Sequence, residues 1–266
     1  MRLGVVLSTG GLRGAAHLGV LRRLTAARLP IDVIVGSSVG AVIGAYYAAV
    51  GLTIDQLIDD APRIHAGHLF FHSLRYHTPS WAQSWLTART GIVPARLDAL
   101  DHARFDRLYH GVSALGIVCH DLETKRPLYV SSADTHGLPL AGVVRASAAI
   151  RPLYPAWSGE ADGVPVRLVD GGYSETLPVK FARDIGASHL IVSDCRRSNE
   201  NLRSDDRAIY VRPAIRGFGI VPSVSFTLQE AVAAGEAAVT DAVIERAREW
   251  HFRRDPGPEG PGLRLN

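Results

Sequence analysis

The chain has 266 residues, of which 47% are hydrophobic and 21% charged, proportions typical of a globular protein with a sizeable core. The net charge of +3 comes almost wholly from arginine, since Lys125 and Lys180 are the only lysines, and it is too small and scattered to predict nucleic-acid binding. Two isolated cysteines, Cys119 and Cys195, form no disulfide framework, and the glycines within 10–14 interrupt any signal-peptide core. We therefore expect a cytoplasmic protein.

The N-terminal part predicts a compact β-α-β-α unit. An apolar strand over Leu3–Leu7 leads through a Gly-rich turn at Ser8–Gly14 into a helix over Ala15–Ala27. A second apolar strand covers Ile31–Val35, and a helix of small residues follows it. This order implies parallel strands joined by a right-handed crossover.

Ser38 lies in a Gly-x-Ser-x-Gly motif between the second strand and its helix. Gly36 and Gly40 are needed because side chains there would collide with the strand and the helix. A turn this tight strains the backbone at Ser38 and lifts its hydroxyl off the sheet edge, where a substrate carbonyl can reach it. The free N–H groups of the helix point to the same reacting centre. The context predicts a serine nucleophile on a nucleophile elbow.

The same segment has a second interpretation as a membrane helix. Residues 33–54 carry no charge, and Gly36, Gly40 and Gly44 repeat at the spacing of a helix-dimer face. The strand–turn–helix interpretation accounts for these glycines and also for Ser38, so we favour it.

The Gly-rich turn before the first helix offers an oxyanion hole. The backbone amides of Gly10, Gly11 and Leu12 can donate to a developing oxyanion, with Arg13 and Gly14 supporting the loop. A nucleotide-binding turn is the alternative, but a threonine precedes Gly10 and breaks the Gly-x-Gly-x-x-Gly pattern, and no lysine follows Gly14 as in a P-loop.

Asp170 is the candidate general base. It ends an apolar strand and precedes two glycines, and a carboxylate at the carboxyl end of a parallel strand lies on the rim where ligands bind. Buried near Ser38, it could take the hydroxyl proton directly; a plain turn is the alternative. A Ser-His-Asp triad would need His189 or His251, and neither lies in a predicted turn.

Residues 62–95 are rich in aromatic side chains and histidine and have no clean period. We interpret them as an irregular cap or lid-like excursion with a helix near Ser80–Ala88. The aromatic side chains indicate an acyl-chain pocket, an interfacial patch or a cap packed over the core. A metal site would use His65, His68, His72 and His77, but no carboxylate or cysteine lies among them, so we predict no metal and no cofactor.

The remaining elements complete one catalytic domain over residues 1–252. We predict strands at Val112–Cys119, Pro127–Val130, Val166–Val169 and His189–Ser193, and helices at Leu138–Ala146, Pro178–Ile185 and Val224–Trp250. Thr53 is expected to be the N-cap of a further helix that runs through Ile58. The long last helix is expected to pack on the core through its apolar side. Repeated prolines and glycines predict a loose tail over residues 253–266.

These elements, in this order, resemble the patatin-like phospholipase family. Four segments are similar to the family's oxyanion loop and helix, its nucleophile elbow, its Ala-Ser-x-x-x-Pro region and its Asp-Gly-Gly segment: Ser8–Leu21, Pro30–Ala49, Ala146–Ile150 with Pro155, and Val169–Ala187. The resemblance implies a modified α/β-hydrolase fold, a three-layer α/β/α sandwich with a mostly parallel central sheet. It also implies a Ser38–Asp170 dyad without histidine and hydrolysis of acyl esters of phospholipids, lysophospholipids or related lipids through an acyl-enzyme, without a metal.

Three places depart from the family pattern. Ser8 and Thr9 stand in the family's run of glycines, Arg151-Pro152 replaces Pro-Gly, and Thr176 stands where asparagine is common. None removes a candidate catalytic group, but each could alter substrate preference.

Two other functions stay open at this point. A pathway-specific acyltransferase or esterase would use the same acyl-enzyme, whereas a lipid-binding regulator on a retired hydrolase scaffold would not need Ser38 and Asp170, which are both present. In each case the expected partner is a lipid or another acyl ester. The positive charge is compatible with peripheral contact at an anionic membrane surface.

Overall fold

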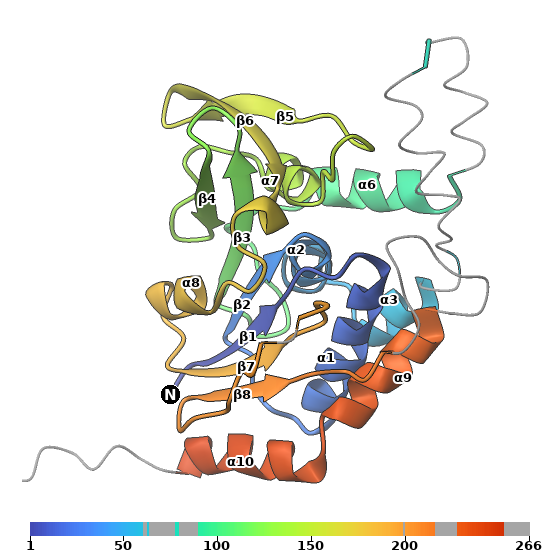
Figure 1. Ribbon diagram of the computed structural model, residues 1–266, viewed down its shortest axis with the longest axis vertical. Helices are drawn as coiled ribbons and strands as arrows, with labels where there is room; N and C mark the ends of the chain where they lie inside the picture. The colour runs from blue at the N-terminus through green and yellow to red at the C-terminus, as the bar shows by residue number, and fades with distance from the viewer. Residues whose placement is uncertain (61–62, 64–77, 80–89, 199, 216–227, 253–266) are drawn as a thin grey trace, which may run out of the picture.

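The computed structural model describes residues 1–60, 63, 78–79, 90–198, 200–215 and 228–252. Within these residues eight strands form one sheet in the order β5-β6-β3-β2-β1-β7-β8, with β4 also paired to β3 (Figure 1). The strands are β1 (Leu3–Leu7), β2 (Val33–Ser37), β3 (Ala114–Asp121), β4 (Arg126–Ser131), β5 (Trp157–Ala161), β6 (Val164–Asp170), β7 (His189–Ser193) and β8 (Ala208–Val211).

The helices lie on both faces of this sheet. They are the 3-10 turn η1 (Gly11–Ala15), α1 (Ala16–Ala26), α2 (Val39–Ala45), the π-helical turn η2 (Tyr46–Val50), α3 (Ile54–Asp60), α6 (Val93–Asp101), α7 (Leu140–Ser147), the 3-10 turn η5 (Gly171–Tyr173), α8 (Val179–Asp184), α9 (Leu228–Ala238) and α10 (Asp241–Phe252). Figure 1 shows α1 and α9 side by side on one face and α8 on the other. The predicted α/β/α sandwich is thus confirmed.

The sheet is parallel through β3, β2, β1, β7 and β8, while β4, β5 and β6 join antiparallel. All five residues of β1 and of β2 are buried, as expected for parallel strands covered on both faces. Alternate side chains enter two separate cores: Leu7 and Ile34 face the α1–α9 side, whereas Val6 and Val35 face α8.

One edge of β3 is shared by two strands that meet end to end. β2 pairs with the first part of β3 and β6 with its last residues, while β4 overlaps both stretches and therefore occupies the opposite edge. β2 runs parallel to β3 and β6 antiparallel, so their carboxyl ends approach each other. The register places Ser37 opposite Val118 and Asp170 opposite Cys119.

The predicted helix over Val224–Trp250 is wrong as one element. Residues 228–252 form two helices, α9 and α10, with a break at Val239 and Thr240. The Thr240 carbonyl accepts the Val243 and Ile244 amides, and its hydroxyl accepts the Val243 amide at 3.4 Å. Thr240 therefore caps the start of α10, a role that the alanine-rich pattern conceals.

One predicted helix start is confirmed, and three short elements were not predicted. Thr53 caps the start of α3, as predicted, because its hydroxyl accepts the Gln56 amide at 3.2 Å and the Gln56 side chain accepts the Thr53 amide at 2.9 Å. The short strands β5 and β8 were missed. So was α6, which begins within the predicted excursion over 62–95.

Several predictions fall outside the described residues. These are most of the excursion over 62–95, including the helix near Ser80–Ala88 and the four histidines, and the tail over 253–266. The extent of one catalytic domain over 1–252 stays a prediction. Among the described helices, none is long and apolar enough to cross a membrane, and the 33–54 segment forms β2, α2 and η2.

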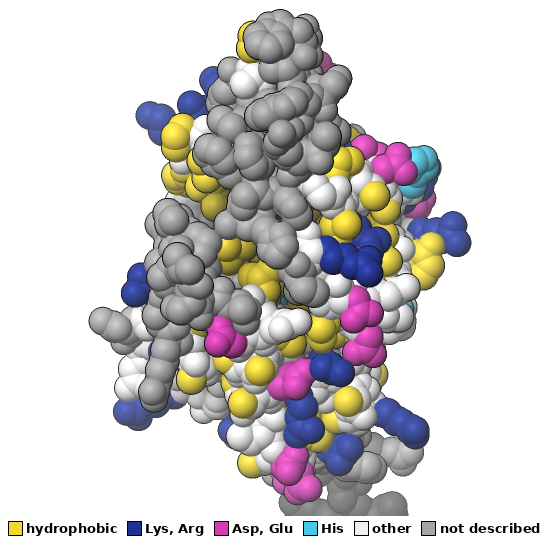
Figure 2. Space-filling view, turned by 90° about the vertical axis from the view of Figure 1, so that its right-hand side faces the viewer, with side chains coloured by type: hydrophobic (Ala, Val, Ile, Leu, Met, Phe, Trp, Pro, Cys, Tyr) yellow, Lys and Arg dark blue, Asp and Glu magenta, His cyan; other side chains and the backbone are white. Residues whose placement is uncertain are grey.

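On the described part of one face, charged side chains of both signs are mixed rather than gathered by sign (Figure 2). Many are paired, as in the contacts of Arg22 with Asp55 and Glu236 and of Arg23 with Asp241. This distribution agrees with the small net charge.

Helices α1 and α9 pack with unusually close backbones. A Cβ atom at Gly235 would overlap the carbonyl of Ala16, and one at Gly19 would overlap the carbonyl of Val232. Both glycines are buried, so the contact depends on the missing side chains.

We expect the Gly235→Ala substitution to lower stability even though alanine favours helix. Helix propensity alone would add about 1 kcal/mol to the free energy of unfolding, whereas forcing a methyl group into the packed contact costs about 1–3 kcal/mol. Urea unfolding of parent and variant measures the difference. A gain in stability equal to the propensity would contradict the close packing.

Candidate active site

The site lies where β2 and β6 meet on the edge of β3. Ser38 follows the last residue of β2, and Asp170 is the last residue of β6. The Ser38 Oγ donates a hydrogen bond to Asp170 Oδ2 at 2.6 Å, across 132 residues of sequence. Both residues are 5% exposed. The structure thus brings together the two side chains that the sequence singled out separately.

The backbone at Ser38 has the strained conformation expected of the motif. Its φ is 58° and its ψ is −126°, outside the regions that side-chain-bearing residues ordinarily adopt. The flanking glycines make this turn compact. A Cβ at Gly36 would overlap the backbone of Gly40, and one at Gly40 would overlap the carbonyl of Leu7. The helix that follows Ser38 can therefore lie directly on β1 and β2.

Asp170 is held by the short turn that follows β6. Its Oδ1 accepts the Gly172 amide at 2.8 Å, and its own amide donates to the Ala149 carbonyl at 3.3 Å. Burial raises the pKa of the Asp170 carboxyl above its ordinary value, and the hydrogen bonds from Ser38 and Gly172 oppose this rise without cancelling it. A carboxylate with a raised pKa accepts a proton more readily than an exposed one.

Ser147 is a residue at the site whose contact sequence reasoning missed. Its Oγ accepts the Ser38 amide at 3.0 Å and donates to the Val118 carbonyl at 2.7 Å. The last residue of α7 therefore joins the serine turn to β3. The sequence signal was the Ala-Ser segment at 146–147, but nothing in it indicates which groups the hydroxyl contacts.

The Gly-rich turn lies against the start of α2. Gly10 is the N-cap of η1, so the amides of Gly11 and Leu12 have no acceptor within that helix. A Cβ at Gly14 would overlap the side chain of Val39, the residue after Ser38. The candidate oxyanion residues therefore belong to a loop that contacts the serine turn.

Arg13 attaches the same loop to the part of the sheet that β7 and β8 form. Its Nε donates to the Cys195 carbonyl at 3.0 Å, and one terminal nitrogen donates to the Ile215 carbonyl at 3.2 Å. These bonds join the turn after β1 to the segments that follow β7 and β8.

Of the two histidines considered as alternative partners of the serine, His189 is not at this site. His189 begins β7 opposite Leu3, at the amino end of the parallel strands, whereas Ser38 lies at their carboxyl end. The side chain of His251 lies outside the described residues. Within the part of the chain that the structure describes, no group of three or more His, Cys, Asp or Glu side chains could hold a metal ion.

The fold and the site define an α/β protein in which a buried serine on a strained strand-to-helix turn is hydrogen-bonded to a buried carboxylate at the end of another strand. The sequence model of the family described as "Patatin-like phospholipase" matches residues 5–183 of the 266. This chain belongs to the patatin-like phospholipase family.

Individual relatives agree with this assignment. Lysophospholipase nte1 of Aspergillus fumigatus is 29% identical over 202 residues, which are 75% of this chain and 12% of that protein. Human patatin-like phospholipase domain-containing protein 6 is 27% identical over 211 residues, covering 74% of this chain and 14% of that protein. The chain therefore spans only 12–14% of the length of these relatives.

A solved structure shares the fold. The crystal structure of VipD from Legionella pneumophila superposes with a TM-score of 0.56 at 14% sequence identity. The superposition covers 93% of this chain and 67% of that one.

Two buried serines beside the nucleophile make a matched pair for mutation. Ser37 and Ser147 are both fully buried, but Ser37 Oγ has no hydrogen-bond partner among the described residues, whereas Ser147 Oγ has two. We expect Ser147→Ala to lower the free energy of unfolding by about 1–3 kcal/mol, because it leaves a buried amide and a buried carbonyl unpaired. Ser37→Ala should change it by less than about 0.5 kcal/mol or raise it, since it removes an unpaired hydroxyl. Equal losses in chemical denaturation would contradict this account.

Proposed function

We propose that this protein is a serine acyl hydrolase in which Ser38 is the nucleophile and Asp170 the general base. The observation that carries the proposal is the 2.6 Å hydrogen bond from the buried Ser38 hydroxyl to the buried Asp170 carboxylate. A serine on a strained turn with an acceptor at this distance has the arrangement that activates a hydroxyl for attack. A histidine between the two side chains is unnecessary because they touch directly.

In the first half-reaction, Ser38 Oγ attacks the carbonyl carbon of the ester while its proton passes to Asp170 Oδ2. The tetrahedral intermediate carries its negative charge on the former carbonyl oxygen. As it collapses, the bond to the leaving alcohol breaks, and protonated Asp170 returns the proton to the alcohol oxygen. The products of this step are the free alcohol and an acyl group esterified to Ser38.

In the second half-reaction, water replaces the alcohol. Asp170 takes a proton from the water as its oxygen attacks the acyl carbonyl, and then gives that proton to Ser38 Oγ as the acyl bond breaks. The carboxylic acid leaves and the free serine is restored. The raised pKa of Asp170 suits it to accepting and returning a proton in each half.

We assign the oxyanion hole to the backbone amides of Gly10, Gly11 and Leu12. The contact of Gly14 with Val39 supports this, because it puts the loop against the serine turn. The start of η1 also offers N–H groups and the positive end of a helix dipole. Arg13 would support the loop through its bonds to Cys195 and Ile215 rather than touch the substrate.

The relatives favour lipid esters as the substrate class. Proteins named lysophospholipase and patatin-like phospholipase match three quarters of this chain. We therefore propose acyl esters of phospholipids or lysophospholipids as substrates. A cytoplasmic protein that contacts a membrane surface peripherally fits such substrates, because they reside in membranes.

Hydrolysis of p-nitrophenyl esters of graded chain length tests the dyad. We expect Ser38→Ala and the isosteric Asp170→Asn to lower kcat by about 10³-fold or more, because one removes the nucleophile and the other the proton acceptor. Near-normal activity of Asp170→Asn would exclude the dyad. A parent protein that neither hydrolyses esters nor reacts with a fluorophosphonate would favour a lipid-binding role, and acyl transfer would appear as a new ester or amide when an acceptor is added.

The pH profile gives a second test. Only ionised Asp170 can accept the serine proton, so kcat/KM should fall as pH falls through the pKa of this carboxyl. Because burial raises that pKa, the midpoint should lie above the usual aspartate value of about 4. Tryptophan fluorescence at each pH controls for acid unfolding. A midpoint at or below the usual value would contradict the assignment of Asp170 as a buried base.

A further inference from the structure

The peptide unit between Ser8 and Thr9 is held at both of its polar ends. Its N–H, on Thr9, donates to the Thr176 carbonyl at 3.0 Å, and its C=O, on Ser8, contacts His17 Nε2 at 2.9 Å. With both ends fixed, the peptide plane cannot rotate without breaking a buried hydrogen bond. The next peptide unit along the chain joins Thr9 to Gly10 and carries the Gly10 N–H.

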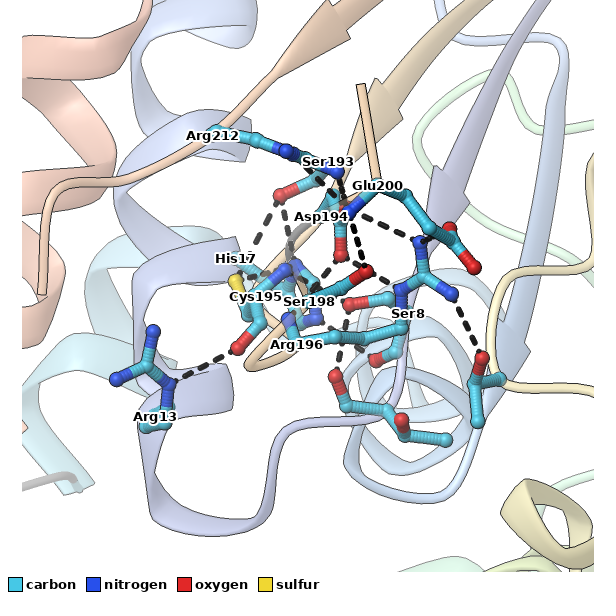
Figure 3. A network of polar contacts seen from close by, with 12 residues as sticks. Ser8, Arg13, His17, Ser193, Asp194, Cys195, Arg196, Ser198, Glu200 and Arg212 are labelled. Atoms are coloured by element: carbon cyan, nitrogen blue, oxygen red, sulfur yellow. Dashed lines mark hydrogen bonds and ion pairs between the residues drawn. The ribbon is translucent and has the colours of Figure 1, made fainter. Parts of the chain in front are cut away.

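The surroundings of His17 fix its tautomer. His17 is fully buried in the first turn of α1, and its Nδ1 lies 2.7 Å from Ser193 Oγ and 3.4 Å from Cys195 Sγ (Figure 3). A carbonyl can only accept, so Nε2 carries the proton toward Ser8 and Nδ1 accepts from the Ser193 hydroxyl. Burial lowers the pKa of His17 to about 4, so the ring is neutral near pH 7.

The Ser8 side chain extends this control to the next peptide unit. Its Oγ accepts the Cys195 amide at 2.8 Å and donates to the Thr9 carbonyl at 2.7 Å. The N–H and C=O of a trans peptide point in opposite directions. Fixing the Thr9 carbonyl therefore fixes the direction of the Gly10 N–H, the first of the amides assigned to the oxyanion hole.

The same Ser8 carbonyl also contacts the serine turn. It lies 2.8 Å from the position that a Cβ on Gly40 would occupy, so it packs directly on the start of α2. A change in its direction would press on the helix that follows Ser38. The His17 contact thus controls both the candidate oxyanion donors and their distance from the nucleophile.

We propose that His17 is a positioning residue: by donating from Nε2 to the Ser8 carbonyl, it sets the direction of the oxyanion-binding amides. Ser193 contributes by keeping the proton on Nε2. The inference rests on the proposed acyl-hydrolase function. It requires no contact between His17 and the substrate and no change of protonation during the reaction.

A pair of amide substitutions separates this role from a general packing role. In His17→Gln, the side-chain amide nitrogen can take the place of Nε2 and donate to Ser8. In His17→Asn, the shorter side chain reaches only the Nδ1 position and can still accept from Ser193, but it leaves the Ser8 carbonyl unpaired. Both substitutions put a neutral amide in the same buried space.

For the parent protein and both variants, we would measure kcat and KM for a p-nitrophenyl ester, melting temperature, and amide hydrogen exchange over residues 8–14. We expect His17→Asn to lower kcat by about 10- to 100-fold with KM nearly unchanged, because misdirected donors weaken transition-state binding. His17→Gln should keep kcat within about threefold of the parent. Exchange over residues 8–14 should become faster only in His17→Asn.

Equal losses of kcat in the two variants, or no loss in either, would overturn the positioning role while leaving the hydrolase intact. A parent protein without turnover would instead refute the proposed function, and the inference with it. If His17→Asn does not fold, His17→Gln carries the test by itself, because its amide nitrogen can still donate to the Ser8 carbonyl. A kcat within about threefold of the parent would support the positioning role, and a loss of about 10-fold or more would overturn it.

Discussion

The arrangement of the whole site depends on two strands of opposite direction sharing one edge of β3. β2 fills the part of this edge up to Val118 and β6 fills it from Cys119, so their carboxyl ends face each other along the same line of hydrogen bonds. Ser38 directly follows β2 and Asp170 ends β6, so the backbone pairing brings the two residues close enough for their side chains to form a hydrogen bond. The short side chains of serine and aspartate are long enough to form this hydrogen bond because the sheet already holds the two strand ends close together.

The other contacts limit how far this meeting point can move. Ser147 links the Ser38 amide to β3, and the Ala149 carbonyl accepts the Asp170 amide. Ser147 is the last residue of α7, and Ala149 follows two residues later, so the end of one helix holds both catalytic candidates. On the opposite side, the turn after β1 is attached through Ser8, His17 and Ser193 to the end of β7. The site is thus assembled from the carboxyl ends of several strands, the edge at which α/β sheets commonly bind their ligands.

Much of this could be predicted from sequence, and the failures have physical reasons. Ser38 and Asp170 were found because glycines beside each of them indicate tight turns at strand ends. Ser147 and His17 were not assigned their contacts, because no local pattern reveals which carbonyl, amide or hydroxyl a side chain meets. Three of these partners are far away in the chain, and even the Ser8 carbonyl, nine residues before His17, is an unmarked backbone group. The break at Thr240 was overlooked because apolar residues on both sides continue the helical spacing, although Thr240 caps the start of a second helix.

The shared edge of β3 also has a consequence for biosynthesis. The chain is made from its N-terminus, so the serine, its elbow and the Gly-rich turn are complete long before Asp170, 132 residues later, leaves the ribosome. Until β6 joins β3, the serine has no carboxylate beside it. With the proposed dyad, a nascent or truncated chain can contain the whole nucleophile motif and still be inert toward lipid esters. Activity begins only when β6 has paired with β3.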